Sequence, residues 1–199
     1  MRRFLPFTFV CTLTVFTTFA HAQQINVAVG GSTLFSPNRS SASLAYPPPA
    51  EKGGDYPSAS AEILFSNNFG FQVDAAFRYH RELYNGYQQY RPILYDVNAV
   101  FAPKLSPKVR ADFMGGVGVQ TLVFYNPSGS CSSNGGSCPL YINSNHFLVH
   151  LSADARYYFW RNFFVRPEAH YYRIVNNFEF HSDNVLRLGA SVGYTFGSR

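Results

Sequence analysis

After residue 22 the sequence has no run of about 18 apolar residues and no segment with a convincing 3.6-residue period. These two absences exclude a membrane-spanning helix and leave no helix that the pattern would support. Charge is sparse as well: the formal net charge is +5, and it falls to about +3 if Arg2 and Arg3 are cleaved off with the N-terminal segment. So mild an excess gives no reason to expect nucleic acid as a partner.

Residues 1–22 have the three parts of a secretory signal peptide. An arginine pair at the start precedes the uncharged apolar stretch 4–20, and "AHA" then forms a small-x-small cleavage site. We expect export by the Sec route, cleavage before Gln23 and a single mature domain over 23–199. An exported chain without a membrane-spanning helix is either soluble outside the cytoplasm or a β-barrel.

Cysteine is also scarce, with three residues in the chain. Cys11 lies in the segment expected to be removed, which leaves Cys131 and Cys138 on either side of "SSNGGS". Two such cysteines in an oxidising compartment most simply pair, so we expect a disulfide that closes a short loop. There is no metal-ligand spacing here, and the glycines at 115–118 are followed by no Lys-Ser/Thr. We therefore expect neither a metal site nor a cofactor.

Eight segments alternate apolar residues with polar or small ones, which is the period of a β-strand with one apolar face. The clearest is the last, "LRLGASVGYTF". Each has around ten residues or more, and a tilted strand needs roughly 9–11 to cross a bilayer. The eight segments are 25–35, 56–65, 69–80, 90–101, 109–124, 147–159, 163–174 and 186–196.

The connections between these segments alternate between short and long. The short ones are "SNN", "APKLSPK" and "WRN", at 66–68, 102–108 and 160–162. The alternate ones, rich in Ser, Pro, Gly and Asn, are 36–55, 82–89, 126–144 and 175–184. Short periplasmic turns and longer extracellular loops are the asymmetry of an outer-membrane barrel, so both termini should be periplasmic. In the three-residue turns we expect asparagine to take the left-handed conformation.

The polar face of the segments carries charges of both signs at matched heights. In the hairpin around "WRN", Asp154 should lie opposite Glu168 and Arg156 opposite Arg166. Along the diagonals Arg156 would be near Glu168, and Asp154 near Arg166. A narrow lumen would hold such residues as a paired network, because a buried charge is costly unless it is paired. The predicted lumen network is Glu62, Asp74, Arg78, Asp96, Arg110, Asp112, Asp154, Arg156, Arg166, Glu168 and Arg187.

Aromatic residues make up 18% of the chain, and those of the apolar face gather near the short-turn end. This is typical of a girdle at a membrane boundary, with Phe159 and Phe163 facing each other across the "WRN" turn. The predicted girdle is Phe65, Phe69, Phe101, Tyr157, Phe159, Phe163, Tyr194 and Phe196. We therefore expect the apolar face to meet lipid. A soluble, lipocalin-like carrier would turn the same face inward and is kept as an alternative.

The last strand ends in the aromatic residues Tyr194 and Phe196, and "RPEAHYYR" (166–173) precedes it. On these stretches the chain resembles the small outer-membrane β-barrel proteins of Gram-negative-type bacteria, the porin-family or OmpA-transmembrane-like group. The resemblance covers nearly all of the mature chain and implies an all-β, eight-stranded antiparallel up-and-down barrel in the cell outer membrane. It also implies outer-membrane lipid, lipopolysaccharide and the barrel-assembly machinery as partners. Many members stop at the terminal aromatic, whereas here three residues follow it.

Eight strands enclose an interior that side chains fill, so an open diffusion pore is not expected. We expect a structural, adhesion or loop-mediated binding role, with an extracellular ligand that the sequence does not identify. A narrow or gated small-solute channel is the transport alternative, since the charge network could rearrange.

A lipid A or phospholipid hydrolase is the enzymatic alternative. Some eight-stranded outer-membrane barrels that cleave lipid A have a His-x-Ser on one strand and a Glu on its neighbour, and this chain has His150, Ser152 and Glu168. A serine nucleophile needs a histidine base and an acid to orient it. Lipid lies outside the barrel, however, and these residues fall on the predicted lumen face, with Ser152 opposite His170. We therefore expect lumen residues here and not an enzyme.

Overall fold

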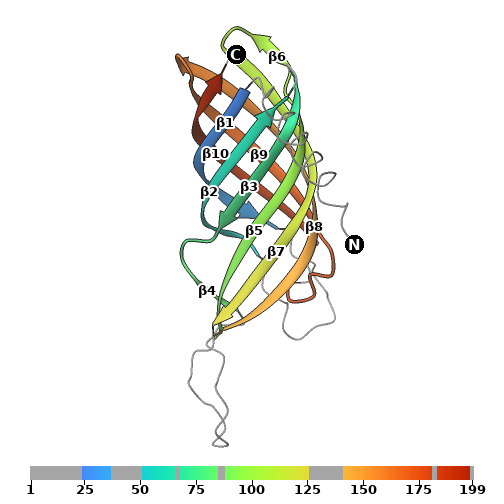
Figure 1. Ribbon diagram of the computed structural model, residues 1–199. Coiled ribbons are helices and arrows are strands. Elements are labelled where there is room, and N and C mark those ends of the chain that lie inside the picture. Colours follow the sequence, from blue (N-terminus) through green and yellow to red (C-terminus); the bar gives the residue numbers. More distant parts are fainter. Residues whose placement is uncertain are drawn as a thin grey trace, which may run out of the picture.

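The computed structural model is a barrel of antiparallel strands (Figure 1), and its described residues are 24–36, 51–65, 68–84, 88–125, 141–180 and 183–197. The wall consists of β1 (Gln24–Phe35), β2 (Gly53–Leu64), β3 (Phe69–Phe77), β5 (Gln88–Phe101), β7 (Val109–Tyr125), β8 (Tyr141–Trp160), β9 (Phe163–Ile174) and β10 (Asn184–Gly197). Two short strands, β4 (Glu82–Tyr84) and β6 (Lys104–Ser106), extend its ends. Each segment expected from the alternating pattern is one of the long strands.

Two expectations concern residues outside the described part of the chain, namely the signal peptide 1–22 and the disulfide between Cys131 and Cys138. No helix among the described residues is long and apolar enough to cross a membrane.

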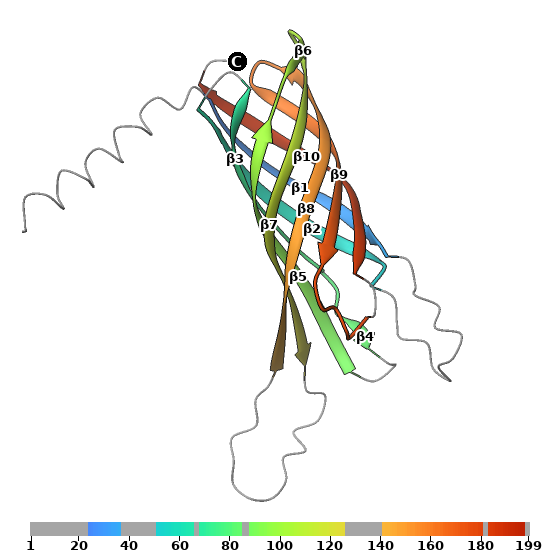
Figure 2. The same cartoon turned by 90° about the vertical axis from the view of Figure 1, so that its right-hand side faces the viewer.

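The sheet closes on itself because its first and last strands are neighbours. β1 pairs with β2 on one side and with β10 on the other, while β5 joins β3 to β7. All the wall pairings are antiparallel between neighbours, so the strands run up and down around the barrel (Figure 2). The expected eight-stranded antiparallel barrel is therefore confirmed. Gln24 pairs with Gly197, so the first and last described strands meet at the short-turn end.

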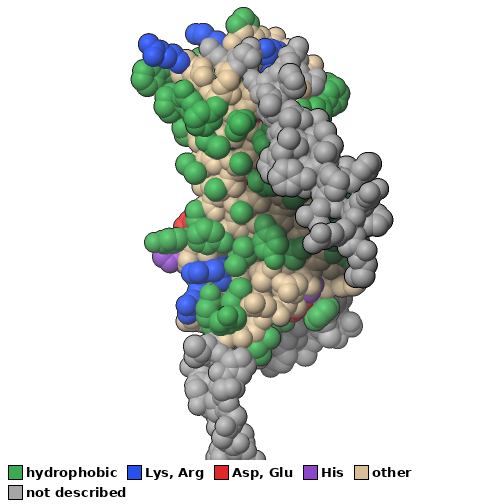
Figure 3. Space-filling view, in the orientation of Figure 1, with side chains coloured by type: hydrophobic (Ala, Val, Ile, Leu, Met, Phe, Trp, Pro, Cys, Tyr) green, Lys and Arg blue, Asp and Glu red, His purple; other side chains and the backbone are tan. Residues whose placement is uncertain are grey.

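Successive side chains on each strand point alternately out of the barrel and into it. On β3, Phe69, Phe71 and Val73 are more than half exposed, whereas Gln72 and Asp74 are buried. Apolar side chains accordingly cover the outer wall along the height of the barrel (Figure 3). A soluble, lipocalin-like carrier needs the opposite arrangement, so that alternative is wrong.

The turn between β8 and β9 is tighter than the sequence predicts. β8 continues to Trp160, which pairs with Phe163 after a register shift that begins at Tyr158. The predicted pairing of Phe159 with Phe163 is therefore wrong, although their ring centroids are 6.5 Å apart. The extra residue on β8 is a bulge, a common device at the rim of a barrel.

The left-handed residue of this turn is Arg161, with φ of 46°, and not the asparagine that we expected. Asn162 instead donates its side-chain amide to the backbone carbonyl of Thr195 at 2.7 Å. The side chain of the asparagine therefore ties the β8–β9 turn to the last strand.

At the opposite end, three wall strands continue beyond the closed part of the barrel, and the short strand β4 joins them. β5 pairs with β3 only as far as Ile93, and β8 with β9 only as far as Leu148. β7 and β8 nevertheless stay paired up to Tyr125 and Tyr141, and β4 pairs with the outer part of β5. This extension, the loop-end sheet, comprises residues 82–84, 88–92, 121–125 and 141–147. It is the described part that reaches furthest from the short-turn end, where Gln24 and Gly197 meet (Figure 2).

Candidate functional site

The interior of the barrel holds every residue of the predicted lumen network in a buried position. Nearest the short-turn end, the guanidinium of Arg156 lies between two carboxylates. Its Nη2 is 2.9 Å from Oε2 of Glu62 and 2.7 Å from Oδ2 of Asp112. The expected diagonal partner, Glu168, is not the partner of Arg156, because β2 and β7 present closer carboxylates across the narrow lumen.

A second layer lies deeper in the barrel and is centred on Arg166. This guanidinium binds Glu168 at 2.8 Å through Nη2, and its Nε lies 4.0 Å from the carboxylate of Asp154. The Arg166 side chain also donates to Ser60 on β2, and Ser191 on β10 donates to Glu168. Asp154 lies opposite Glu168, as the hairpin register predicts. This layer thereby connects four of the eight wall strands.

Two histidines continue the network toward the loop end. Nε2 of His150 lies 2.9 Å from Nδ1 of His170, and the rings stack with centroids 5.1 Å apart. Nδ1 of His150 faces Asn98 at 2.6 Å and Asp96 at 3.3 Å, while Nε2 of His170 lies 3.3 Å from Glu168. Neighbouring polar side chains thus bind both rings. In the described chain, no group of three or more His, Cys, Asp or Glu could hold a metal ion.

The residues of the hydrolase alternative do not come together as a catalytic triad. The hydroxyl of Ser152 is buried and has no hydrogen-bond partner within the described structure. Ser152 pairs across the strands with His170, as expected, while His150 contacts Asn98 and His170. A nucleophile needs a base within about 2.6–3.2 Å. The arrangement therefore gives His150 and Glu168 partners in the lumen network and leaves Ser152 without a base.

Above the histidines the lumen changes from charged to apolar. Arg187 binds Asp74 at 2.7 Å, and its guanidinium lies 5.6 Å from the ring of Tyr172. The apolar layer that follows has no solvent-exposed surface and consists of Leu34, Tyr56, Leu94, Leu148, Tyr172, Ile174 and Val185. Close-packed side chains of this kind exclude water. This layer, which we call the apolar seal, lies between the Arg187–Asp74 pair and the loop end.

Glu51 occupies the lumen on the loop-end side of the apolar seal. It lies in the segment 36–55, which we expected to be an exposed loop, yet its side chain is fully buried. Both of its carboxylate oxygens lie 2.7 Å from the amide nitrogen of Gln120. Burial raises the pKa of Glu51 to about 7, and the nearby carboxylates of Glu82 and Glu179 add to the increase. A single glutamate in a polar segment carries no periodic signal, so sequence reasoning could not find it.

The inner face of the loop-end sheet is covered by aromatic packing. Tyr90, Leu122 and Phe124 pack with Phe180, which comes from the segment after β9. Tyr84 on β4 donates its hydroxyl to the backbone carbonyl of Glu179 at 2.9 Å. The side chain of Glu179 in turn faces two residues of β8, Ser144 at 2.5 Å and His146 at 3.1 Å. Segment 175–180 therefore closes the loop-end mouth of the barrel.

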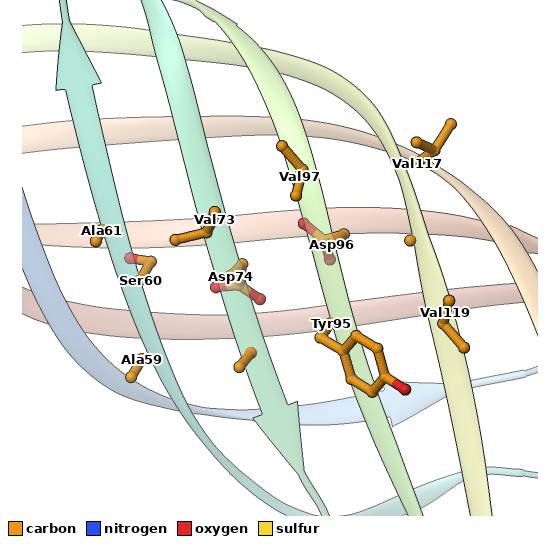
Figure 4. A pocket seen from close by; sticks show the side chains of 12 residues that line it. Ala59, Ser60, Ala61, Val73, Asp74, Tyr95, Asp96, Val97, Val117 and Val119 are labelled. Atoms are coloured by element: carbon orange, nitrogen blue, oxygen red, sulfur yellow. The ribbon is translucent and has the colours of Figure 1, made fainter. Parts of the chain in front are cut away.

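The outer wall has a shallow depression of about 620 Å³ across β2, β3, β5 and β7 (Figure 4). Its floor is formed by small side chains, Ala59, Ala61 and Ala75, between the larger Tyr95 and a set of valines. The exposed residues around it, such as Val97, are apolar. The depression is therefore part of the apolar outer surface and is separate from the polar lumen.

The barrel resembles several solved outer-membrane proteins. With Ail, the attachment invasion locus protein of Yersinia pestis, it has a TM-score of 0.58 at 15% identity, over 87% of this chain and 98% of that one. With the N-terminal β-barrel domain of Pseudomonas aeruginosa OprF the score is 0.58 at 13% identity, over 87% and 98%. With Neisserial surface protein A it is 0.54 at 12% identity, over 88% and 96%.

No protein-family model and no curated protein matches this sequence. At such low identities the structural likeness shows the fold alone. That fold is the small eight-stranded β-barrel of bacterial outer membranes, which confirms the architecture that the sequence resemblance implies.

Proposed function

We propose that this chain is an outer-membrane protein that binds an extracellular partner through its loop-end sheet. The observation that carries the proposal is the length of β7 and β8, which have 17 and 20 residues and stay paired far beyond the closed barrel. A strand crosses a bilayer with roughly 9–11 residues, so the remainder of both strands stands outside it. Residues that do not serve to cross the membrane are available for recognition.

The surface of this extension suits a binding role. Tyr141 and Ile142 near its tip are more than half exposed, and Arg81 stacks on the ring of Tyr125 with its guanidinium 3.7 Å from the centroid. Exposed aromatic and arginine side chains are the residues that most often anchor interfaces. The inner face is packed against Phe180, so the sheet is held in place as a preformed platform.

The sealed lumen favours binding over transport. The apolar seal crosses the interior, and charged layers fill the part below it. Among proteins of the same fold, Ail has been solved with the heparin analogue sucrose octasulfate. A sulfated polysaccharide is therefore the first probe to use for this chain, whose tip region presents Arg81.

The test compares two ends of the same barrel. Bacteria displaying the chain are measured for attachment to epithelial cells, and the barrel in nanodiscs is measured for binding to immobilised heparin. The variant pair Arg81→Ala with Tyr141→Ala should lower attachment at least about fivefold, since both side chains lie at the proposed surface. The matched pair Lys108→Ala with Leu105→Ala removes one basic and one exposed apolar side chain at the short-turn end. It should leave attachment and heparin binding unchanged. Equal attachment by both variants would contradict the proposal.

A further inference from the structure

The short-turn end of the barrel carries a cavity that the proposed binding role does not use. The cavity has a volume of about 320 Å³ and is lined by Lys104, Ser106, Pro107, Val109, Arg110 and Tyr158. Arg110 and Tyr158 point into the lumen and are almost fully buried, whereas Lys104 and Ser106 belong to β6 and are exposed. The cavity, which we call the vestibule, therefore lies where the lumen meets the short-turn end, the end that we expect to be periplasmic.

The described lining of this vestibule is basic and rich in hydrogen-bond donors. It includes one lysine, one arginine and two hydroxyl groups but no carboxylate. Its floor is fixed by neighbouring side chains: Arg110 donates to Gln24 at 3.0 Å, and Gln24 lies 3.3 Å from the hydroxyl of Tyr158. Glu62 and Asp112, the nearest carboxylates on the lumen face, bind Arg156.

The turns around the vestibule carry further positive charges. Lys108 and Arg161 lie in the adjoining turns, and Figure 3 shows Lys and Arg side chains but no Asp or Glu at this end of the visible face. At the loop end, by contrast, carboxylates such as Asp55 and Asp183 accompany the arginines. A lysine and an arginine with hydroxyl donors beside them form a group that binds phosphate oxygens.

We propose that this vestibule binds a phosphate group, most directly the phosphate of an anionic phospholipid in the adjacent leaflet. Leu105, between the two lining residues of β6, is 67% exposed. Phe101, which ends β5 just before this turn, and Tyr157 are exposed on the outer wall nearby. These apolar side chains hold the turn at the membrane boundary, where phospholipid head groups lie. Free inorganic phosphate offers the same chemistry and is the other possible source.

The experiment separates these two sources. The mature chain is refolded in zwitterionic detergent, and binding of inorganic phosphate is measured by ³¹P NMR. The refolded chain is then placed in nanodiscs of phosphatidylcholine with or without phosphatidylglycerol, and lipid retained by the protein is counted by native mass spectrometry. Retention of phosphatidylglycerol over phosphatidylcholine identifies a lipid head group, and binding of inorganic phosphate in detergent identifies the free anion. Absence of both overturns the proposal.

Two neighbouring lysines provide the matched control. Lys104→Glu reverses a charge that lines the vestibule and should weaken binding roughly tenfold, whereas Lys108→Glu reverses a charge on the same turn outside the lining. We expect Lys108→Glu to weaken binding less than about twofold. Equal losses in both variants would mean general attraction to a basic rim and would overturn the proposal. Ser106→Ala, which preserves charge, should weaken binding about threefold through the loss of one donor.

The shift in gel mobility on boiling shows whether each variant is a folded barrel, because folded membrane barrels migrate compactly until heated. Neither readout involves attachment or heparin, so failure here leaves the proposed binding role of the loop-end sheet intact. A negative result in the attachment test likewise does not contradict the proposal that the vestibule binds phosphate.

Discussion

The two halves of the lumen are filled in opposite ways. On the short-turn side, arginines are fixed between carboxylates, as Arg156 is between Glu62 and Asp112. Toward the loop end the filling is mainly apolar, with Leu94 and Leu148 in the seal and aromatic rings beyond it, and Glu51 is a carboxylate buried there against an amide, Gln120, instead of between arginines. A charge surrounded by protein and lipid is stable only with a partner in defined geometry, whereas apolar packing needs volume and shape. The charged half therefore specifies which strands face one another, and the loop-end half is where we expect the barrel to be closed to water.

The largest expected effect comes from removing the central cation of the charged half. Arg156→Met leaves Glu62 and Asp112 buried without their shared partner, which should lower the free energy of unfolding by roughly 3–5 kcal/mol. Urea unfolding in lipid vesicles, followed by the gel-mobility shift, measures this change. The exposed pair of Arg173 with Asp183 is the control, and Arg173→Gln should cost below about 1 kcal/mol.

A second variant checks the cause of that loss. Combining Arg156→Met with Glu62→Gln and Asp112→Asn removes the uncompensated charge and should recover most of the stability. A triple variant as unstable as Arg156→Met alone would show that packing of the arginine, and not charge compensation, holds this half together.

The next effect is a pH dependence of the loop-end half, where Glu51 is buried. The pKa of Glu51 is raised from 4.5 to about 7 by burial. Between these two pH values the Glu51 carboxyl is protonated while the loop end is closed, and it loses its proton when that end opens to water. The stabilisation is complete below pH 4.5 and is lost as the pH rises through 7, a change of about 3 kcal/mol for a shift of this size. Hydrogen exchange of the amides near Glu51, corrected for intrinsic rates, should therefore accelerate with pH. Glu51→Gln should remove this dependence, and a persistent dependence in that variant would assign it to another group.

The smallest effect is expected from a substitution within the apolar seal. Leu148→Ala opens a cavity in a fully buried layer and should lower the free energy of unfolding by about 2–3 kcal/mol. Leu151→Ala on the same strand removes an equal volume from the lipid-facing wall, where Leu151 is 56% exposed, and should cost less. Planar-bilayer recordings provide the second readout, since removing more of the seal with Leu94→Ala should create a small conductance, whereas we expect none from the natural chain. A stable conductance in the natural chain would contradict the sealed lumen.

The sequence predicts the barrel well because its main signals are local. Alternation along β3, from Phe69 to Phe77, identifies both the strand and its outward face, and the short "WRN" connection identifies a hairpin. The register of that hairpin follows the prediction through Asp154 and Glu168 up to Tyr158 and Phe164. It fails at Trp160, where one residue bulges and shortens the turn. A bulge changes the count by one residue, and the alternation of the flanking strands does not reveal it.

The candidate sites were less predictable, since they join distant parts of the chain. Arg156 and Glu62 are 94 residues apart, and their contact depends on how far each strand is staggered around the barrel. Glu51 gave no signal at all, because nothing in its segment shows that it folds into the mouth. In the sequence, Lys104 of the vestibule is only one charge in a short connection, and nothing there indicates that it lines a cavity.

By itself, the sequence determined the number of strands, the outward direction of the apolar face and the end at which the turns are short. Each depends on a two-residue period or on connection length, and both are properties of neighbouring residues. The tertiary structure alone decided which carboxylates hold Arg156, where the apolar seal lies and that β7 and β8 extend into a loop-end sheet. Those features arise when strands far apart in the chain are brought side by side with a particular stagger, and closure of the barrel fixes that stagger.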